Sequence, residues 1–179
     1  MNLDNALWQF ALHHYAKPEV EQACLNLQTH GLSVNRLLHA LWASEQGIAI
    51  EHCDLAAADA WRAKFTTEQR RLRYAIREEK QAFMDDTLDQ VYAAMRKAEL
   101  ACEQVELALL AQATLARGQP SINTPEHRLD LVLKNLGSVL NQAKVICSDS
   151  EAMQQNLAML LTQVSYTLPD NWHKQLLRH

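Results

Sequence analysis

Residues 7–42 read LWQFALHHYAKPEVEQACLNLQTHGLSVNRLLHALW, and this stretch decides the fold class. Its apolar side chains recur every three or four residues, which is the spacing of one face of a helix. Pro18 and Gly31 are its only helix-breaking residues. Proline suits the first turn of a helix, and glycine suits the left-handed position after one. The pattern predicts three helices, at 4–15 with Asp4 as N-cap, at 18–30, and at 33–46 with Ser33 as N-cap.

The segment that follows predicts a fourth helix. Asp54 is a suitable N-cap, and an alanine-rich run leads from it to Trp61 and Phe65. Sustained alternation of apolar and polar residues is absent from the sequence, apart from the short stretch at 48–50. A β-sheet is therefore not expected.

The chain changes character after residue 66. No glycine or proline occurs between residues 67 and 117. Apolar residues recur there at the heptad spacing of a coiled-coil seam: Leu88, Val91, Met95, Ala98, Cys102, Val105 and Leu109. A continuous helix of about 50 residues would be roughly 75 Å long, which is too long for a compact domain. We expect a bend or an antiparallel turn near Asp85 and Asp86 rather than one long helix.

The sequence thus predicts an all-α protein in three parts. An aromatic-rich N-terminal helical unit occupies 1–66, a long helix or helical hairpin occupies 67–117, and a C-terminal helical hairpin at 118–179 packs on it. The stretch at 118–123, GQPSIN, is typical of a linker. The length of 179 residues also suits one domain overall. The apolar stripes of these helices must be covered by other helices or by a second copy of the chain.

Composition and charge narrow the function classes. The net charge of −4 gives no general attraction to nucleic acid or to anionic lipid. The N-terminal residues have neither a basic nor an apolar segment, and no apolar run reaches the roughly 20 residues of a membrane span. The four cysteines form no CxxC pair, and the eight histidines lack metal-ligand spacing. We therefore predict a cytoplasmic protein with no cofactor and no membrane partner.

The N-terminal block contains the first group of candidate site residues: Trp8, Gln28, Asn35, Trp42 and Trp61. Gln28 and Asn35 are its polar members, and Asn35 lies beside apolar positions of the third helix. Their amides could contact a peptide or ligand. The structural alternative is that they fix the turn between the second and third helices, since buried amides are normally hydrogen-bonded.

A basic face at 62–80 is the second candidate. This segment has a net charge of +4, against −8 for the rest of the chain. Arg70, Arg73 and Arg77 share one helix face, and Tyr74 lies beside them. Such a row could bind phosphates or an acidic partner. Charged helix faces more often serve solubility, so a solvated surface is the structural alternative.

Residues 85–89 read DDTLD, which matches the DDxxD pattern of magnesium–diphosphate sites. Helical spacing places Asp85 and Asp89 on one face, with Asp86 beside them. A second acidic motif across a cavity would be needed, and the sequence has none. Carboxylates are also favourable at the N-terminus of a helix, so this weak metal candidate has a structural alternative.

The N-terminal block also carries a family resemblance. It resembles an uncharacterised family of small all-helical proteobacterial proteins, conserved hypotheticals, with the pattern Leu-Trp-x-Phe-Ala, Ala-Cys-Leu-x-Leu-Gln, Val-Asn-x-Leu-Leu and Leu-Trp. These motifs begin here at Leu7, Ala23, Val34 and Leu41. Two departures are His39, where an apolar residue is usual, and Glu68-Gln69 in place of Pro-Leu. The resemblance implies an all-helical protein and assigns no catalytic residue.

These patterns together favour a non-enzymatic protein-interaction or adaptor module whose protein partner is unknown. A homodimer is predicted through the heptad positions Leu88, Met95, Cys102 and Leu109. One alternative is an RNA- or ribosome-associated protein that uses the basic face at 62–80. Another is a small magnesium-dependent enzyme that binds diphosphate at 85–89.

Overall fold

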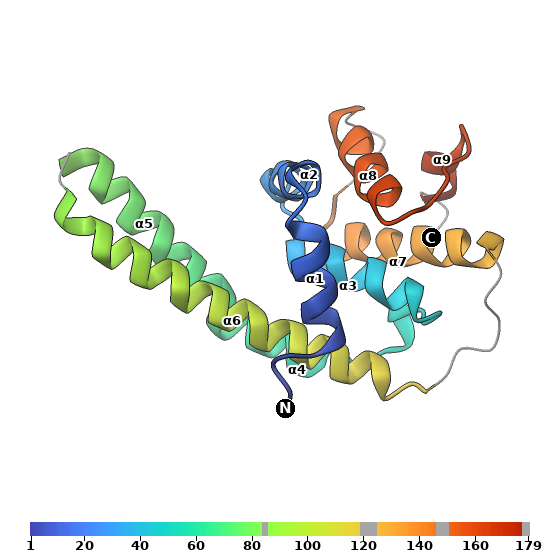
Figure 1. Cartoon of the computed structure of the whole chain (residues 1–179), viewed down its shortest axis with the longest axis horizontal. Coiled ribbons are helices and arrows are strands. Elements are labelled where there is room, and N and C mark those ends of the chain that lie inside the picture. Colours follow the sequence, from blue (N-terminus) through green and yellow to red (C-terminus); the bar gives the residue numbers. More distant parts are fainter. Residues whose placement is uncertain (84–85, 119–124, 146–150, 177–179) are drawn as a thin grey trace.

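The computed structural model describes residues 1–83, 86–118, 125–145 and 151–176. Every regular element within these ranges is a helix. This confirms the prediction of an all-α protein. The predicted linker lies outside the described residues, apart from Gly118, and so does Asp85. Figure 1 shows a group of packed helices from which two long helices extend together to one side.

The first three helices are α1 (Ala6–Tyr15), α2 (Pro18–Thr29) and α3 (Val34–Glu45). Pro18 opens α2, and Gly31 follows it with a φ of 88°, as their residue types predict. Ser33 is the N-cap of α3. The N-cap of α1 is Asn5 and not the predicted Asp4, because the Asn5 side chain accepts a 3.0 Å hydrogen bond from the Trp8 amide.

The helix at the centre of the fold is α3. All its side chains from Asn35 to Ser44 are buried. It packs against α1, α2, α6 (Asp89–Leu115) and α7 (Pro125–Gln142). Because α3 is covered on all sides, its polar residues must find partners inside the protein.

A 3₁₀ turn (Ile50–His52) leads to α4 (Ala56–Trp61), which continues through a π-helical segment (Arg62–Thr66) into α5 (Thr67–Phe83). Asp54 accepts a hydrogen bond from the Ala56 amide, but the N-cap position belongs to Leu55 and not to the predicted Asp54. The π-helical segment adds a residue to the turn, so it changes the face that α5 presents relative to α4.

A second 3₁₀ turn (Asp86–Leu88) precedes α6, which returns antiparallel to α5. Residues 67–117 therefore contain a helical hairpin and not one continuous helix. Figure 1 shows that α5 and the first part of α6 project from the other helices, whereas the end of α6 lies among them. We call residues 67–103 the arm, and the place where it meets α3 and α4 the root.

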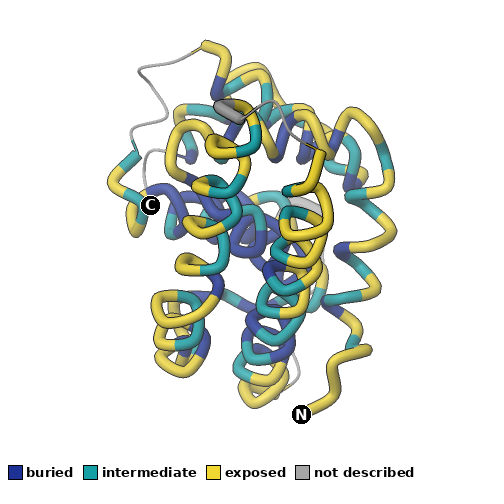
Figure 2. Tube along the Cα trace, turned by 90° about the vertical axis from the view of Figure 1, so that its left-hand side faces the viewer, coloured by how far each residue is buried: buried dark blue, intermediate teal, exposed yellow. Residues whose placement is uncertain are grey.

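The C-terminal helices α7, α8 (Glu151–Gln163) and α9 (Trp172–Leu176) complete the core. One buried apolar cluster joins α2, α3, α7, α8 and α9, and a second joins α1, α3, α4 and α6. Figure 2 shows buried positions gathered in the middle of the molecule and exposed positions along its outer faces. Since α3 contributes to both clusters, it links the root of the arm to the C-terminal helices.

Candidate functional site

An ion-pair network holds the two helices of the arm together. Among the described residues of the arm, Glu99 alone is buried. Its carboxylate accepts hydrogen bonds from Arg70 Nε, at 2.8 Å, and from Arg73 Nε, and Arg70 also binds Glu103 at 2.5 Å. Burial raises the pKa of Glu99, but the hydrogen bonds from Arg73 and Arg70 outweigh this effect, so the pKa lies below its ordinary value. The network therefore holds α5 against α6.

The remaining members of the predicted basic face form a stack. The Tyr74 ring lies 4.4 Å from the Arg73 guanidinium carbon and 4.7 Å from that of Arg77. The Tyr74 hydroxyl accepts a 3.3 Å hydrogen bond from Gln28 Nε2. Gln28 thus connects α2 to the arm. Of the three arginines in the row, Arg70 and Arg73 are used within the arm, while Arg77 is exposed.

Two further residues of the N-terminal block bind the backbone of α6 at the root. Trp61 Nε1 donates a 2.9 Å hydrogen bond to the carbonyl of Cys102. Asn35 Nδ2 donates a 3.5 Å hydrogen bond to the carbonyl of Glu103. The structure therefore brings Gln28, Asn35 and Trp61 together with the basic face around one end of the arm.

The other two tryptophans of the block lie in the interior. Trp42 is buried in the cluster of α1, α3, α4 and α6, and Trp8 packs against the same cluster while partly exposed. Their contacts are those of core residues. Neither shares a polar contact with the arm in the described residues.

The acidic half of the network is a feature that the sequence analysis missed. Glu99, Glu103 and Glu106 follow one another at steps of four and three residues, so they share one face of α6. The sequence does contain this pattern, because the three glutamates recur at helical spacing on the same helix as the apolar heptad stripe. The partners of Glu99 and Glu103 could not be identified, since Arg70 and Arg73 lie about 30 residues away in the chain.

The root contains two buried ionisable groups whose hydrogen bonding is incomplete. Glu106 is 0% exposed, and neither of its carboxyl oxygens has a partner at normal hydrogen-bond distance and angle among the described residues, although the side chains of Thr66 and Asn35 lie close enough to lower its pKa. Burial raises its pKa, and the charges of Arg62 and Arg36 oppose this shift only in part. Arg36 is 3% exposed and pairs through Nη2 with Asp59, but its Nε and Nη1 have no partner in the part of the chain that is described. Native proteins seldom leave such groups unpaired.

His39, which departs from the resemblance pattern, is also buried. Its Nε2 lies 2.7 Å from the Oγ1 of Thr114, whose hydroxyl donates to the carbonyl of Leu110 at 3.1 Å. Nε2 must therefore carry the hydrogen of the first bond. Burial, with the charge of Arg36, lowers the pKa of His39 to about 3. The side chain is thus held as a neutral imidazole.

The acidic residues of the DDxxD stretch do not form a metal centre in the described part of the structure. Asp89 pairs with Lys80 across the end of the arm. Asp86 lies in the 3₁₀ turn before α6, and Asp85 is outside the described residues. Throughout the described ranges, no group of three or more His, Cys, Asp or Glu side chains is arranged to hold a metal ion.

The heptad stripe of α6 passes through two environments. Leu88, Met95 and Cys102 lie on the arm, where each is only partly buried. Leu109 lies beyond the arm and packs against the cluster of α1, α3, α4 and α6. The stripe is therefore covered by the core at its C-terminal end and incompletely covered along the arm.

A search of curated proteins and a search of solved structures found no match to this chain. In the ranges that the structure describes, no helix is both long and apolar enough to cross a membrane. A protein-family match covers residues 6–110, which is more than half of the chain and extends from the start of α1 into α6. It includes the arm, its root and the N-terminal block. The chain belongs to the family described as "Protein of unknown function (DUF2390)".

Proposed function

We propose that the protein is a protein-interaction module that uses the arm as its contact surface, and that a second copy of the chain is the partner. One observation carries the proposal. In the described ranges 67–81 and 86–98 of the arm, no side chain is buried, although both helices contain apolar residues at helical spacing. Helices in proteins gain most of their stability by packing an apolar face. The apolar residues of the arm lack this packing, so a partner that covered them would stabilise the arm.

The apolar residues of the arm are partly exposed on both helices. Leu72 on α5 and Val91 on α6 are each 39% exposed, and Met95 continues the α6 stripe. Single exposed apolar residues need no explanation, but a stripe that continues along a helix does. A four-helix bundle formed by two arms would cover both stripes.

Charge favours a second copy over a partner of strong opposite charge. Residues 67–103 contain seven basic and eight acidic side chains, so the net charge of the arm is −1. Two such arms would not repel one another strongly, whereas a strongly basic or acidic arm would require a complementary partner. Pairing about a two-fold axis would use the same stripe on both copies.

The ion-pair network supports this role because it holds the arm in one conformation. Arg70, Arg73 and Glu99 join α5 to α6 before any partner is present. A surface that is ordered in advance loses less conformational entropy when it binds. The free thiols of Cys24, Cys53 and Cys102 fit a reducing compartment, which supports a cytoplasmic location.

Nucleic-acid binding has weaker support than association of two arms. Arg70 and Arg73 are already paired with acidic residues of α6, so only part of the predicted basic face remains for phosphates. Diphosphate binding at 85–89 also lacks support, because Asp89 is paired with Lys80.

Association through the arm can be tested by measuring the mass of the protein in solution. Light scattering coupled to size exclusion should give twice the chain mass of 20.4 kDa for the natural sequence. Val91→Glu and Met95→Glu place charges in the proposed interface, so each should shift the protein to a single chain while circular dichroism shows an unchanged helix content.

A matched control is Leu12→Glu, which changes an apolar residue on α1 that is 47% exposed. This variant should keep the mass of the natural protein. A natural protein that remains a single chain up to high concentration would refute the proposed dimer. Equal loss of the dimer in all three variants would also count against a specific contact along the arm.

A further inference from the structure

The ion pairs of the arm show how its two helices are aligned. They join α5 to α6 at successive levels: Arg70 with Glu103, Arg73 with Glu99, and Lys80 with Asp89. Because the two helices run antiparallel and rise equally per residue, these pairs place Ile76 of α5 level with Met95 of α6. This level divides the arm into a root half, residues 67–75 and 96–103, and a tip half, residues 76–95.

The charged residues are divided unequally between these halves. The root half has five basic and three acidic side chains, so its net charge is +2. The tip half has two basic and five acidic side chains, so its net charge is −3. The arm as a whole is nearly neutral, but its two ends carry opposite charge.

Part of this charge is available to another molecule. Arg96 and Lys97 of the root half are exposed, and so are Glu78 and Glu79 of the tip half. The ion pairs in the described part of the arm use other side chains. Exposed charges of opposite sign therefore lie at the two ends of the surface proposed to bind a second copy.

Two arms that pair along their apolar stripes could run in the same direction or in opposite directions. Parallel pairing would place the two negative tip halves side by side, and likewise the two positive root halves. Antiparallel pairing would place each tip half beside the root half of the other copy. Packed helices lie about 8–10 Å apart, which is about one Debye length at 0.1 M salt, so this difference in charge is only partly screened.

The shape of the molecule also favours the antiparallel direction. Figure 1 shows the other helices grouped at the root end of the arm, whereas the tip end projects away from them. Parallel pairing would bring two such groups together at one end. Antiparallel pairing keeps them at opposite ends and leaves the arms free to meet along their length.

We propose that two copies of the chain pair with their arms antiparallel, so that the tip of each arm lies beside the root of the other. This inference rests on the proposed dimer and adds the direction in which its arms run. With a two-fold axis at the level of Met95, Leu88 of one copy lies opposite Cys102 of the partner subunit, because the two positions are equally distant from Met95 along α6.

Reversal of charge at the tip tests the direction of pairing. Glu78→Lys combined with Glu79→Lys changes the tip half from −3 to +1. In the antiparallel dimer it then faces a root half of the same sign, so the dissociation constant from analytical ultracentrifugation should rise about tenfold at low ionic strength, and less at high salt. A parallel dimer would become tighter, because repulsion between the tips would fall. Addition of Arg96→Glu and Lys97→Glu to this variant should restore association.

The matched control is Glu19→Lys combined with Glu21→Lys. Both residues are exposed on α2, outside the arm, and the change in total charge is the same. The dissociation constant of this variant should equal that of the natural protein. Equal weakening by the control and the tip variant would overturn the proposal, because association would then follow total charge.

Cross-linking provides a second readout on the full chain. Each sample carries Cys53→Ser and Cys147→Ser, while Cys24 remains because its side chain is buried. One sample retains Cys102, and the other carries Cys102→Ser with Leu88→Cys. After the two are mixed and exchange partners, mild oxidation should form a disulfide between Cys102 and the introduced thiol. Neither sample alone should cross-link.

Light scattering of the same samples separates failure of this inference from failure of the proposed dimer. A natural protein that is a single chain refutes the dimer itself. A dimer that cross-links in the unmixed samples, or that the tip variant tightens or leaves unchanged, refutes antiparallel pairing alone. A dimer that forms no disulfide in the mixture refutes the alignment about Met95.

Discussion

His39 is a buried side chain that makes the stability of this protein sensitive to acid. In the folded state its pKa is about 3, whereas an unfolded histidine has an ordinary value of 6.5. Burial disfavours the charged form, and the Thr114 contact uses the neutral ring as a donor. Below pH 6.5 the unfolded chain therefore binds a proton that the folded protein excludes.

This difference in proton binding between the folded and unfolded states determines whether stability rises or falls with pH. The stability that His39 contributes is complete above pH 6.5 and is lost progressively as the pH falls toward 3. The slope is about 1.4 kcal/mol per pH unit for one proton. We predict that His39→Leu reduces the loss of unfolding free energy between about pH 7 and about pH 5, as measured by chemical denaturation. An unchanged difference between the two pH values in this variant would show that other groups dominate.

At the scale of elements, ion pairs hold the two helices of the arm together, whereas apolar packing holds the helices of the core together. Glu99 has two arginine partners and lies between the helices, so removing its charge leaves both guanidinium groups without their main acceptor. The pair Arg71–Glu68 has the same chemistry but lies exposed on the outer face of α5. Exposed pairs of this kind contribute little, because water screens the charges and the side chains remain mobile.

These two pairs provide a matched test of the arm. We predict that Glu99→Gln destabilises the arm by about 2–3 kcal/mol, because a partly buried, hydrogen-bonded charge pair is broken. Hydrogen exchange of the α5 amides should report this loss, since amide exchange follows local opening of a helix and does not require global unfolding. Glu68→Gln should change the same exchange rates by less than about 0.5 kcal/mol. Similar effects of the two substitutions would contradict a clamping role for Glu99.

At the scale of the whole molecule, the core depends on helices that lie beyond the family match. The match ends at residue 110, yet α7 and α8 contribute buried residues to the larger apolar cluster. These are Val132, Leu133 and Leu136 from α7 and Leu157, Leu160 and Leu161 from α8. Without them, one face of the central helix α3 would be open to water.

We therefore predict that a chain ending at Gly118 does not fold cooperatively. Burial of one large aliphatic side chain contributes about 2 kcal/mol, so the six residues together approach the net stability of about 5–15 kcal/mol of a typical domain. Thermal unfolding followed by circular dichroism should show a broad transition or aggregation in place of a single step. A sharp transition in the shortened chain would show that the first 118 residues form an independent domain.

The sequence by itself determined the local structure of this protein. Pro18 and Gly31 mark helix ends as their residue types predict, and Ser33 occupies the predicted N-cap position without a capping hydrogen bond from its side chain. The absence of glycine and proline at 67–117 predicted the long helical segment. Such signals act within one helical turn and need no knowledge of distant residues. The shift from Asp4 to Asn5 as N-cap is of the same local kind, since both residue types can cap a helix.

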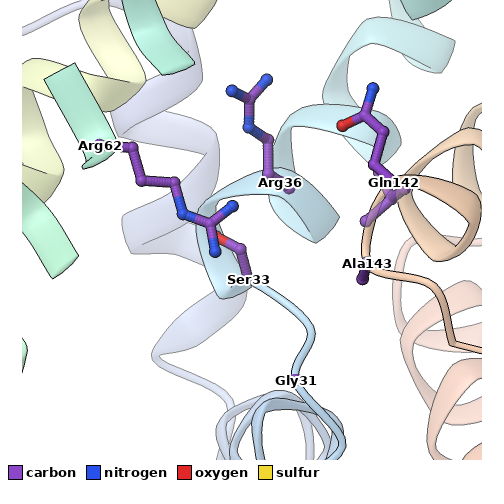
Figure 3. A pocket seen from close by; sticks show the side chains of 7 residues that line it. Gly31, Ser33, Arg36, Arg62, Gln142 and Ala143 are labelled. Carbon is purple, nitrogen blue, oxygen red and sulfur yellow. The ribbon is translucent and has the colours of Figure 1, made fainter. Parts of the chain in front are cut away.

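Only the tertiary structure decided which side chains meet. The basic face predicted from its spacing turned out to be paired with Glu99 and Glu103 of α6, and His39 found its partner 75 positions away in Thr114. A small pocket at the start of α3 is lined by Arg36, Arg62 and Gln142, which no local pattern relates (Figure 3). The physical reason is that helical periodicity gives the face on which a residue lies, whereas the packing of one helix on another gives the partner of that face.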